Sequence, residues 1–428
     1  MENKMHHSPL WDLGYKTIRE LETEQGILAS GKEEIYGCIF GRDSLITSLE
    51  LMKAYERTKD DYFLGLVKKI LLNLGDLQGK TINIESGEEP GKCIHEFRPA
   101  NHEHLTKSLA TPWYVYPDHM MRNYDTVDAT PLFLIAVHEF YSLSHDGDFL
   151  NRIMPKVYLA LDWLLTYGDS NHDGFIDYRF HPDRTYGGLR TQSWMDSSES
   201  VFHAGGEAVV YPIAPVEVQA YAYAALRRWG DYFTVSYPVL RRRLMLRATR
   251  LKNLFNRKFV IRNGSEVSLA YAIDGNGKLL TAPRSSMGHV LWAIGRRRGG
   301  APDGILENAS IPGLVSRLLS PDLFEPEAGI RTLGVLSENF DPKSYHNGSI
   351  WPHDTSILIE GFENYGYRRE AARVRRALLS AYEYFQTPIE LFVFTDGHYS
   401  EYRSEAGQAA CRKQAWSAAA MLAESILP

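Results

Sequence analysis

The sequence contains His346-Asn347-Gly348-Ser349-Ile350-Trp351-Pro352-His353 directly before a stretch of helical hydrophobic periodicity at about 353–365. In the same way, Gly41-Arg42-Asp43-Ser44 stands at the start of a helical pattern at about 43–57. In both places, side chains able to bind a ligand gather where a helix begins. Since loops are commonly polar only because they are exposed, the arrangement is informative only if it repeats along the chain.

The arrangement does repeat, and this predicts the fold. Periodicity predicts about twelve helices, at roughly 10–29, 43–57, 61–77, 129–145, 149–167, 213–229, 236–257, 285–297, 303–320, 353–365, 367–385 and 411–426. Four further polar or aromatic motifs precede or open even-numbered helices: Tyr124-Asp125-Thr126-Val127-Asp128, Trp194-Met195-Asp196-Ser197 and onward to Pro212, Pro283-Arg284-Ser285, and Lys413-Gln414-Ala415-Trp416. We therefore predict an all-α fold, an (α/α)6 barrel whose even helices form an inner ring with a ligand pocket at their N-termini.

One segment departs from the helical pattern. Residues 258–282 alternate weakly around Asp274-Gly275-Asn276-Gly277, which predicts a short β-hairpin insertion on the surface. No Pro/Ser-rich linker interrupts the chain, so we expect a single barrel domain over residues 1–428.

Composition excludes several classes of protein. Of the 428 residues, 44% are hydrophobic and 23% charged, which is typical of a globular protein and excludes a disordered chain or a collagen. The formal net charge of -6 argues against a nucleic-acid partner. No run of about 18 apolar residues and no signal-peptide core is present, so we expect a cytoplasmic protein without a membrane partner. The sparse cysteines Cys38, Cys93 and Cys411 fit a reducing compartment and form no zinc motif, and no cofactor or metal is expected.

Several sequence blocks carry a resemblance to a known family. They are Phe40–Thr47, Glu88–Arg98, Val127–Phe133, Gln192–Ser197, Pro212–Gln219, Ala410-Cys411 and Gln414-Ala415-Trp416. In these blocks, which span roughly 36–426, the chain resembles the catalytic domain of bacterial amylo-alpha-1,6-glucosidases, or glycogen-debranching-like glycoside hydrolases. These are (α/α)6-barrel, or six-hairpin, glycosidases, to which glucoamylase and trehalase are more distant relatives.

The resemblance implies an inverting, exo-acting hydrolase of α-glucosidic linkages, with Asp196 as general acid and Glu390 as general base. Glycoside hydrolysis needs such a pair of carboxyl groups. Asp196 follows Trp194 and Met195, an apolar neighbourhood that favours a protonated carboxyl, although a helix N-cap is the alternative. Glu390 interrupts an apolar run, but Glu401 and Glu405 in the same loop are competing candidates for the base.

Other residues are candidates for binding carbohydrate. The full set is Arg42, Asp43, His95, Glu96, Asp125, Asp128, Trp194, Glu217, Gln219, His346, Trp351, His353 and Trp416. The resemblance implies that Arg42 and Asp43 grip the terminal sugar, and the alternative is an internal ion pair. For Glu96 the alternative is an ion pair with Arg98 or Lys92, while Trp side chains are suited to stacking on sugar faces.

Three further functions remain open from the sequence: a phosphorolytic enzyme on the same barrel, a non-catalytic glycan-binding protein, and a sugar epimerase that uses His346 and His353. The Asp169–Asp177 loop resembles a calcium loop but has Phe180 at the twelfth position, so a turn is favoured. The substrate is expected to be short, an oligosaccharide or a small glucoside, although a polymer stays open. The oligomeric state is not predicted.

Overall fold

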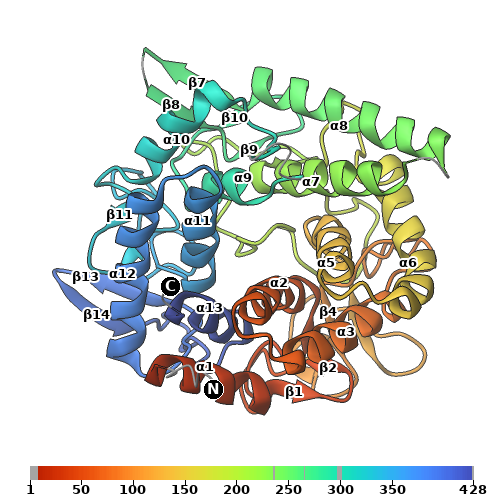
Figure 1. Cartoon of the computed structure of the whole chain (residues 1–428), viewed down its shortest axis with the longest axis horizontal. Coiled ribbons are helices and arrows are strands. Elements are labelled where there is room, and N and C mark those ends of the chain that lie inside the picture. The colour runs from red at the N-terminus through yellow and green to blue at the C-terminus, as the bar shows by residue number, and fades with distance from the viewer. Residues whose placement is uncertain (1–7, 235–236, 265, 296–300, 427–428) are drawn as a thin grey trace, which may run out of the picture.

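The computed structural model describes residues 8–234, 237–264, 266–295 and 301–426, and helices dominate this part of the chain (Figure 1). Six helix units form an inner ring: α2 (Gly41–Thr58), α5 (Ala129–Ser144), α7 (Val216–Tyr232), α9 (His289–Trp292) with the preceding 3-10 turn η1 (Ser285–Gly288), α11 (Pro352–Asn364) and α13 (Ala415–Ser425). Each contacts the next around the ring, and α13 closes it by packing against α2.

An outer layer of helices surrounds this ring (Figure 1). It consists of α1 (Pro9–Leu21), α3 (Asp61–Asp76), α6 (Gly147–Thr166), α8 (Pro238–Lys258), α10 (Ile311–Leu318) after the 3-10 turn η2 (Asn308–Ser310), and α12 (Arg368–Phe385). The two layers confirm the predicted (α/α)6 barrel, in which the second helix of each predicted pair lies inside.

Burial along the helices follows from this layering. In α5 the side chains are buried on every side from Ala129 to Val137, because an inner helix has neighbours all around it. In α12 burial recurs at Ala371, Val374 and Leu378, a spacing of three to four residues that places one apolar stripe against the ring.

Short strands connect the helices. They are β1 (Glu22–Thr23) with β2 (Gly26–Ile27); β3 (Ile39–Phe40), β4 (Glu96–Arg98) and β5 (Met121–Asn123); β6 (Ala214–Pro215), β9 (Ala272–Ile273) and β10 (Leu279–Leu280); β7 (Val260–Asn263) with β8 (Glu266–Leu269); β11 (Phe324–Glu325) with β12 (Gly329–Ile330); and β13 (Phe392–Thr395) with β14 (His398–Glu401). A short helix, α4 (Glu103–Thr106), lies between β4 and β5. β3 runs directly into α2, and β6 runs directly into α7. The two three-stranded sheets that contain β3 and β6 therefore lie at the N-terminal end of the inner ring.

Two predicted elements were wrong in their extent. The first helix ends at Leu21 rather than 29, because Gly26 adopts a φ of +116° and turns the chain into the β1–β2 hairpin. The expected hairpin at 258–282 is two hairpins, β7–β8 and β9–β10. The second is not a surface insertion, since Ala272 and Ile273 are buried and β9 pairs with β6.

Several other helix boundaries also differ. The helix expected at 303–320 begins at Ile311, after η2, and the one expected at 285–297 ends at Trp292, with residues 296–297 outside the described part. No helix in the described ranges is both long and apolar enough to cross a membrane. The cytoplasmic location stays a prediction.

Candidate active site

A cavity of about 220 Å³ lies at the N-terminal end of the inner ring, and both predicted catalytic carboxyl groups line it. Predicted residues among its lining are Arg42, Asp43, His95, Glu96, Trp194, Asp196, His346, Trp351, Glu390 and Trp416. They come from segments up to almost 375 residues apart, and the convergence of inner-helix N-termini brings them together. The shared pocket at one face of the ring is therefore present as expected.

Asp196 lies on the loop before α7, held by its buried neighbours Trp194 and Met195. Its Oδ2 accepts a hydrogen bond of 2.7 Å from Nη2 of Arg42, and its side chain is 22% exposed. Burial raises the pKa of Asp196 to about 6, although the Arg42 guanidinium opposes this rise. A carboxyl group with such a pKa is half protonated at about pH 6, so it can serve as a general acid in mildly acidic solution.

Glu390 lies in the segment between α12 and β13 and is almost fully buried, with 1% exposure. Its Oε2 accepts from the backbone N–H of Cys411 at 2.8 Å, and its Oε1 accepts from the hydroxyl of Tyr345. Burial raises the pKa of Glu390 to about 7, whereas these two donors favour the carboxylate. The two competing glutamates do not line the cavity: Glu401 pairs with Arg412, and Glu405 is exposed.

Arg42 and Asp43 occupy the first turn of α2. Besides Asp196, Arg42 donates from Nη1 to Asp128 at 3.0 Å and to the Ser193 carbonyl at 3.1 Å, so it bridges three segments of the barrel. Asp43 accepts from Nε2 of Gln414 at 3.0 Å, and burial raises its pKa to about 7. Both side chains border the cavity, and the ion pairs of Arg42 are those that the alternative interpretation expected.

His95 and Glu96 reach the cavity from β4. Burial lowers the pKa of His95 well below its usual value, and its Nδ1 has no hydrogen-bond partner. Glu96 pairs with Arg98, as the alternative interpretation expected, and Oε1 of Glu96 also accepts from the Cys38 thiol at 3.6 Å. A neutral imidazole with an unpartnered nitrogen is a ready hydrogen-bonding group for a hydroxylated ligand.

Aromatic rings form one side of the cavity. Trp351 stacks on His346 with ring centroids 5.0 Å apart, and Trp194 packs edge-on against Trp351 at 5.8 Å. The indole N–H groups of Trp194 and Trp416 are buried without a partner. This cluster supplies both flat apolar faces and free donors beside the carboxyl groups.

Five predicted site residues do not line the cavity. They are Asp125, Asp128, Glu217, Gln219 and His353. Asp125 is occupied by Arg184, by Asn123 and by the backbone N–H of Leu189. Asp128 lies beneath the cavity, where it pairs with Arg42.

The other three of these residues are held inside the barrel. The side-chain amide of Gln219 is bonded to backbone groups of Ile176 and Pro215, so it ties the start of α7 to a loop. Glu217 is buried, which raises its pKa to about 8. His353 stacks on Trp416 with centroids 3.7 Å apart.

Eleven lining residues were not predicted, and Tyr36, Tyr345, Gln408 and Gln414 are among them. Tyr345 donates to Glu390, and its hydroxyl also lies 3.3 Å from that of Tyr36. Gln408 donates to the Tyr36 hydroxyl at 3.0 Å. Tyr345 directly precedes the polar motif that begins at His346, and this position was the feature of the sequence that could have indicated a role for Tyr345 in the site. No spacing in the sequence connects position 36 or 345 with position 390.

The calcium-like loop behaves as a turn. Asp169 accepts from Arg247 at 3.2 Å and from the backbone N–H of Gly174 at 3.1 Å, while Asp173 and Asn171 bond each other. Within the described ranges, no three His, Cys, Asp or Glu side chains are grouped in a way that suits a metal ion.

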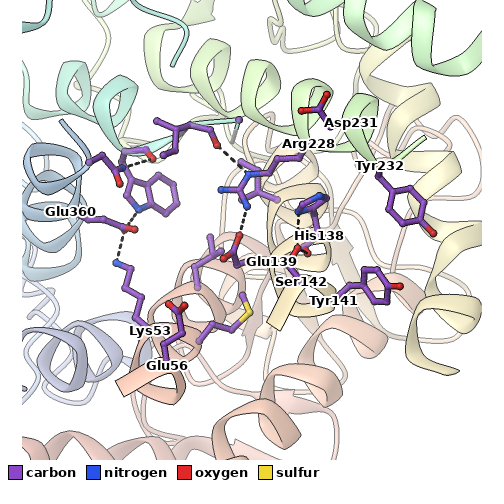
Figure 2. Close-up of a pocket in the computed structure, with 18 of the residues that line it drawn as sticks. Lys53, Glu56, His138, Glu139, Tyr141, Ser142, Arg228, Asp231, Tyr232 and Glu360 are labelled. Atoms are coloured by element: carbon purple, nitrogen blue, oxygen red, sulfur yellow. Dashed lines mark hydrogen bonds and ion pairs between the residues drawn. The ribbon is translucent and has the colours of Figure 1, made fainter. Parts of the chain in front are cut away.

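A larger cavity, of about 830 Å³, lies at the opposite end of the ring and is lined by the C-terminal halves of inner helices (Figure 2). Its charged side chains are largely paired with each other: Lys53 lies 2.5 Å from Glu360, and Arg228 pairs with Glu139. Neither Asp196 nor Glu390 lines it. The smaller cavity is therefore the candidate active site, because both candidate catalytic carboxyl groups line it.

Comparisons with known proteins agree with this architecture. Residues 300–394 match the model of the mannosylglycerate hydrolase MGH1-like glycoside hydrolase domain. No curated protein matches the sequence.

Solved structures are similar over almost the whole chain. The GH63 mannosylglycerate hydrolase from Thermus thermophilus, in complex with Tris, has a TM-score of 0.64 at 16% identity and covers 97% of this chain and 99% of its own. A wild-type glycosidase has a TM-score of 0.54 at 13% identity, with 98% of each chain covered. The chain therefore has the six-hairpin fold of these glycosidases, and the match over residues 300–394 supports a glycoside hydrolase.

Proposed function

We propose that the protein is an inverting, exo-acting glycoside hydrolase of α-glycosides, with Asp196 as general acid and Glu390 as general base. The observation that carries this proposal is that the two carboxyl groups line one cavity, where burial raises the pKa of both. Two such groups around a sugar-binding hollow are what glycoside hydrolysis requires.

Each carboxyl group has a defined step in this reaction. Asp196 gives its proton to the glycosidic oxygen as the bond from that oxygen to the anomeric carbon breaks. Glu390 takes a proton from a water molecule whose oxygen attacks the anomeric carbon from the opposite side, which inverts its configuration. Since Arg42 donates to Oδ2 of Asp196, Oδ1 is the oxygen that carries the transferred proton.

The neighbours of Glu390 support its role as the base. The Tyr345 hydroxyl and the Cys411 N–H each donate to one carboxylate oxygen, and this fixes the orientation of the group. A base carboxylate facing the cavity also favours hydrolysis over phosphorolysis, in which phosphate takes the place of the base. His353, one of the two histidines that an epimerase would use, does not line the cavity.

The depth of the site supports exo action. Arg42, Asp43, Trp351 and Glu390 are buried, whereas Ile35 is 45% exposed and lines the same cavity. A terminal sugar therefore fits at the buried end, with the leaving group toward the exposed end. The choice of glucose and of an α-1,6 linkage rests on the family resemblance.

A second candidate is the hydrolysis of mannosylglycerate. It is favoured by the match of residues 300–394 to the MGH1-like domain and by the similarity to the Thermus thermophilus mannosylglycerate hydrolase. Both candidates use the same acid and base and differ in the sugar and the leaving group.

The test is a screen of α-glucosides and α-mannosides with small leaving groups, in which the anomer of the released sugar is followed by NMR. We expect the β-anomer as first product. Asp196→Asn and Glu390→Gln should each lower kcat by about 10²–10⁴-fold while the circular dichroism spectrum stays unchanged. Release of the α-anomer, or retained turnover in either folded variant, contradicts the proposal.

A further inference from the structure

The leaving-group end of the cavity is largely apolar. Ile35, Leu105, Trp113 and Leu189 line the cavity and are at least partly exposed, in contrast to the buried residues around the acids. Under the proposed function, the leaving group contacts these side chains. Their surfaces suit the CH groups of a sugar or polyol.

The cations of the cavity are already paired. Arg98 lines it but is 5% exposed, pairs through Nε with Glu96 and donates through Nη2 to the Ile35 carbonyl at 2.7 Å. Arg42, the other guanidinium in the lining, donates to Asp128 and Asp196. The positive charge of each arginine is therefore already balanced by a carboxyl group, so neither offers an uncompensated cation to a charged ligand.

The histidines that line the cavity do not supply a positive charge in place of the two arginines. Burial lowers the pKa of His95 and of His346 well below the usual value. Burial, helped by Arg98, also lowers the pKa of His104. At neutral pH these imidazoles are uncharged, so they can donate or accept hydrogen bonds but do not offer a positive charge.

The carboxyl groups of Asp43, Glu96, Asp196 and Glu390 line the same cavity as the two arginines. Glu96 and Asp196 are the direct partners of Arg98 and Arg42. A ligand carboxylate placed here would lose water, gain no uncommitted cation and meet carboxylates of like charge.

We propose that the leaving group of the substrate is uncharged, a sugar or a polyol, and that Glu96 determines this specificity by keeping Arg98 occupied. The inference rests on the proposed function and narrows its substrate class. In this proposal the charges of Glu96 and Arg98 cancel each other, so the pair presents no net charge to the leaving group. The pair takes no part in the proton transfers.

A matched pair of substrates tests the inference directly. The α-glycosides of glycerol and of glycerate, carrying whichever sugar the screen identifies, differ only in a CH₂OH or a carboxylate. We expect the wild-type kcat/KM to be higher for the glycerol compound by at least about 30-fold, which corresponds to one unpaired buried charge.

Glu96→Gln then tests the role of Glu96. The variant keeps the shape of the side chain but frees the Arg98 charge, so the glycerol-to-glycerate ratio of kcat/KM should fall by about tenfold or more. A merely structural defect would lower both rates and leave their ratio unchanged. If Glu96→Gln does not fold, Ile35→Arg adds an unpaired cation at an exposed lining position, with Ile35→Gln as its uncharged control, and the same fall is expected for the arginine variant alone.

The outcomes separate the two proposals. Equal rates on both compounds, a wild-type preference for glycerate, or a ratio that no variant changes would overturn the inference and leave the glycosidase intact. Hydrolysis of no α-glycoside in the screen would overturn the proposed function itself.

Discussion

Nη2 of Arg42 lies 2.7 Å from Oδ2 of Asp196, and the same guanidinium holds Asp128 at 3.0 Å. The Arg42 side chain, from the start of α2, thus connects the candidate general acid with Asp128, the residue directly before α5. The position of the acid depends on two separated nitrogen atoms, a geometry that a single ammonium group lacks.

Arg42→Lys should therefore lower kcat by about 100-fold, because the charge remains but the acid is no longer held in place. Steady-state kinetics on the best substrate of the screen measures the loss, and circular dichroism verifies the fold. Arg241→Lys, on the exposed side of α8, is the matched control. An Arg42→Lys enzyme as active as this control would show that the bridge is dispensable.

The pH dependence of activity should be bell-shaped, with its maximum between about pH 6 and pH 7. The active form needs a protonated Asp196, with a pKa of about 6, and an ionised Glu390, with a pKa of about 7. Because the acid has the lower pKa, only a minority of molecules carries this arrangement, and its share is largest midway between the two values. Activity falls on the acid side as both groups become protonated, and on the alkaline side as both become ionised. A profile that is flat from pH 5 to pH 8 is incompatible with this pair of groups.

Tyr345→Phe extends this prediction to one limb of the profile. Loss of the hydroxyl removes a hydrogen bond that favours the Glu390 carboxylate, so the pKa of Glu390 rises further above its ordinary value. Because Glu390 has the higher pKa of the pair, the alkaline limb should move upward by about one pH unit and the maximum rate should fall, while the acid limb stays in place. Movement of both limbs together would point to a general structural effect instead.

Glu217→Gln should stabilise the protein at alkaline pH. Burial raises the pKa of Glu217 from 4.5 to about 8, so the folded protein retains a proton that the unfolded chain releases. For this group the folded state is favoured below about pH 4.5, and that advantage is lost as the pH rises through about 8.

Removing the ionisable group should raise the free energy of unfolding at pH 9 by about 5 kcal/mol and change it little at pH 4.5. Denaturant unfolding at the two pH values measures this difference, with the exposed Glu383→Gln as control. A gain of the same size at both pH values would show that ionisation is not its cause.

Gly41 permits the close approach of the segment before β4 to the start of α2. A Cβ at this position would lie 2.0 Å from the carbonyl oxygen of Ile94, which belongs to the backbone. Gly41→Ala should therefore destabilise the protein by about 3 kcal/mol or more. It should also disturb Arg42 and His95 on either side of the contact.

Gly65→Ala is the matched comparison, since its Cβ would meet nothing within 4 Å on the exposed side of α3. Here alanine should stabilise the helix by about 1 kcal/mol. Chemical denaturation distinguishes the two variants by the sign of the change. A tolerated alanine at position 41 would mean that β4 can shift without cost.

The helical framework was predictable because each layer has its own hydrophobic pattern. The outer helices carry a stripe, as at Ala371, Val374 and Leu378, and the inner helix α5 is buried on every side from Ala129 to Val137. Boundaries were less predictable, since they depend on single backbone conformations such as that of Gly26. The expectation of one domain over residues 1–428 stays a prediction.

The candidate site was predictable where ligand-binding residues stand at the start of inner helices. The same rule failed for Gln219 and Asp125, because a polar side chain next to a barrel can bind neighbouring backbone or arginine groups just as well as a ligand. Tyr345 and Arg98 could not be assigned in advance, since their roles depend on contacts with Glu390 and the Ile35 carbonyl that only the fold creates.

The closure of the inner ring by α13 also bears on how the molecule is made. α13 is the last barrel helix to leave the ribosome, yet it packs against both α1 and α2, and it carries Trp416 on the wall of the cavity beside Gln414. In a nascent chain that ends at α12, the inner ring is not closed, and the apolar surfaces of α1 and α2 that α13 covers are exposed. Such chains depend on α13 both for protection from aggregation and for a competent catalytic centre.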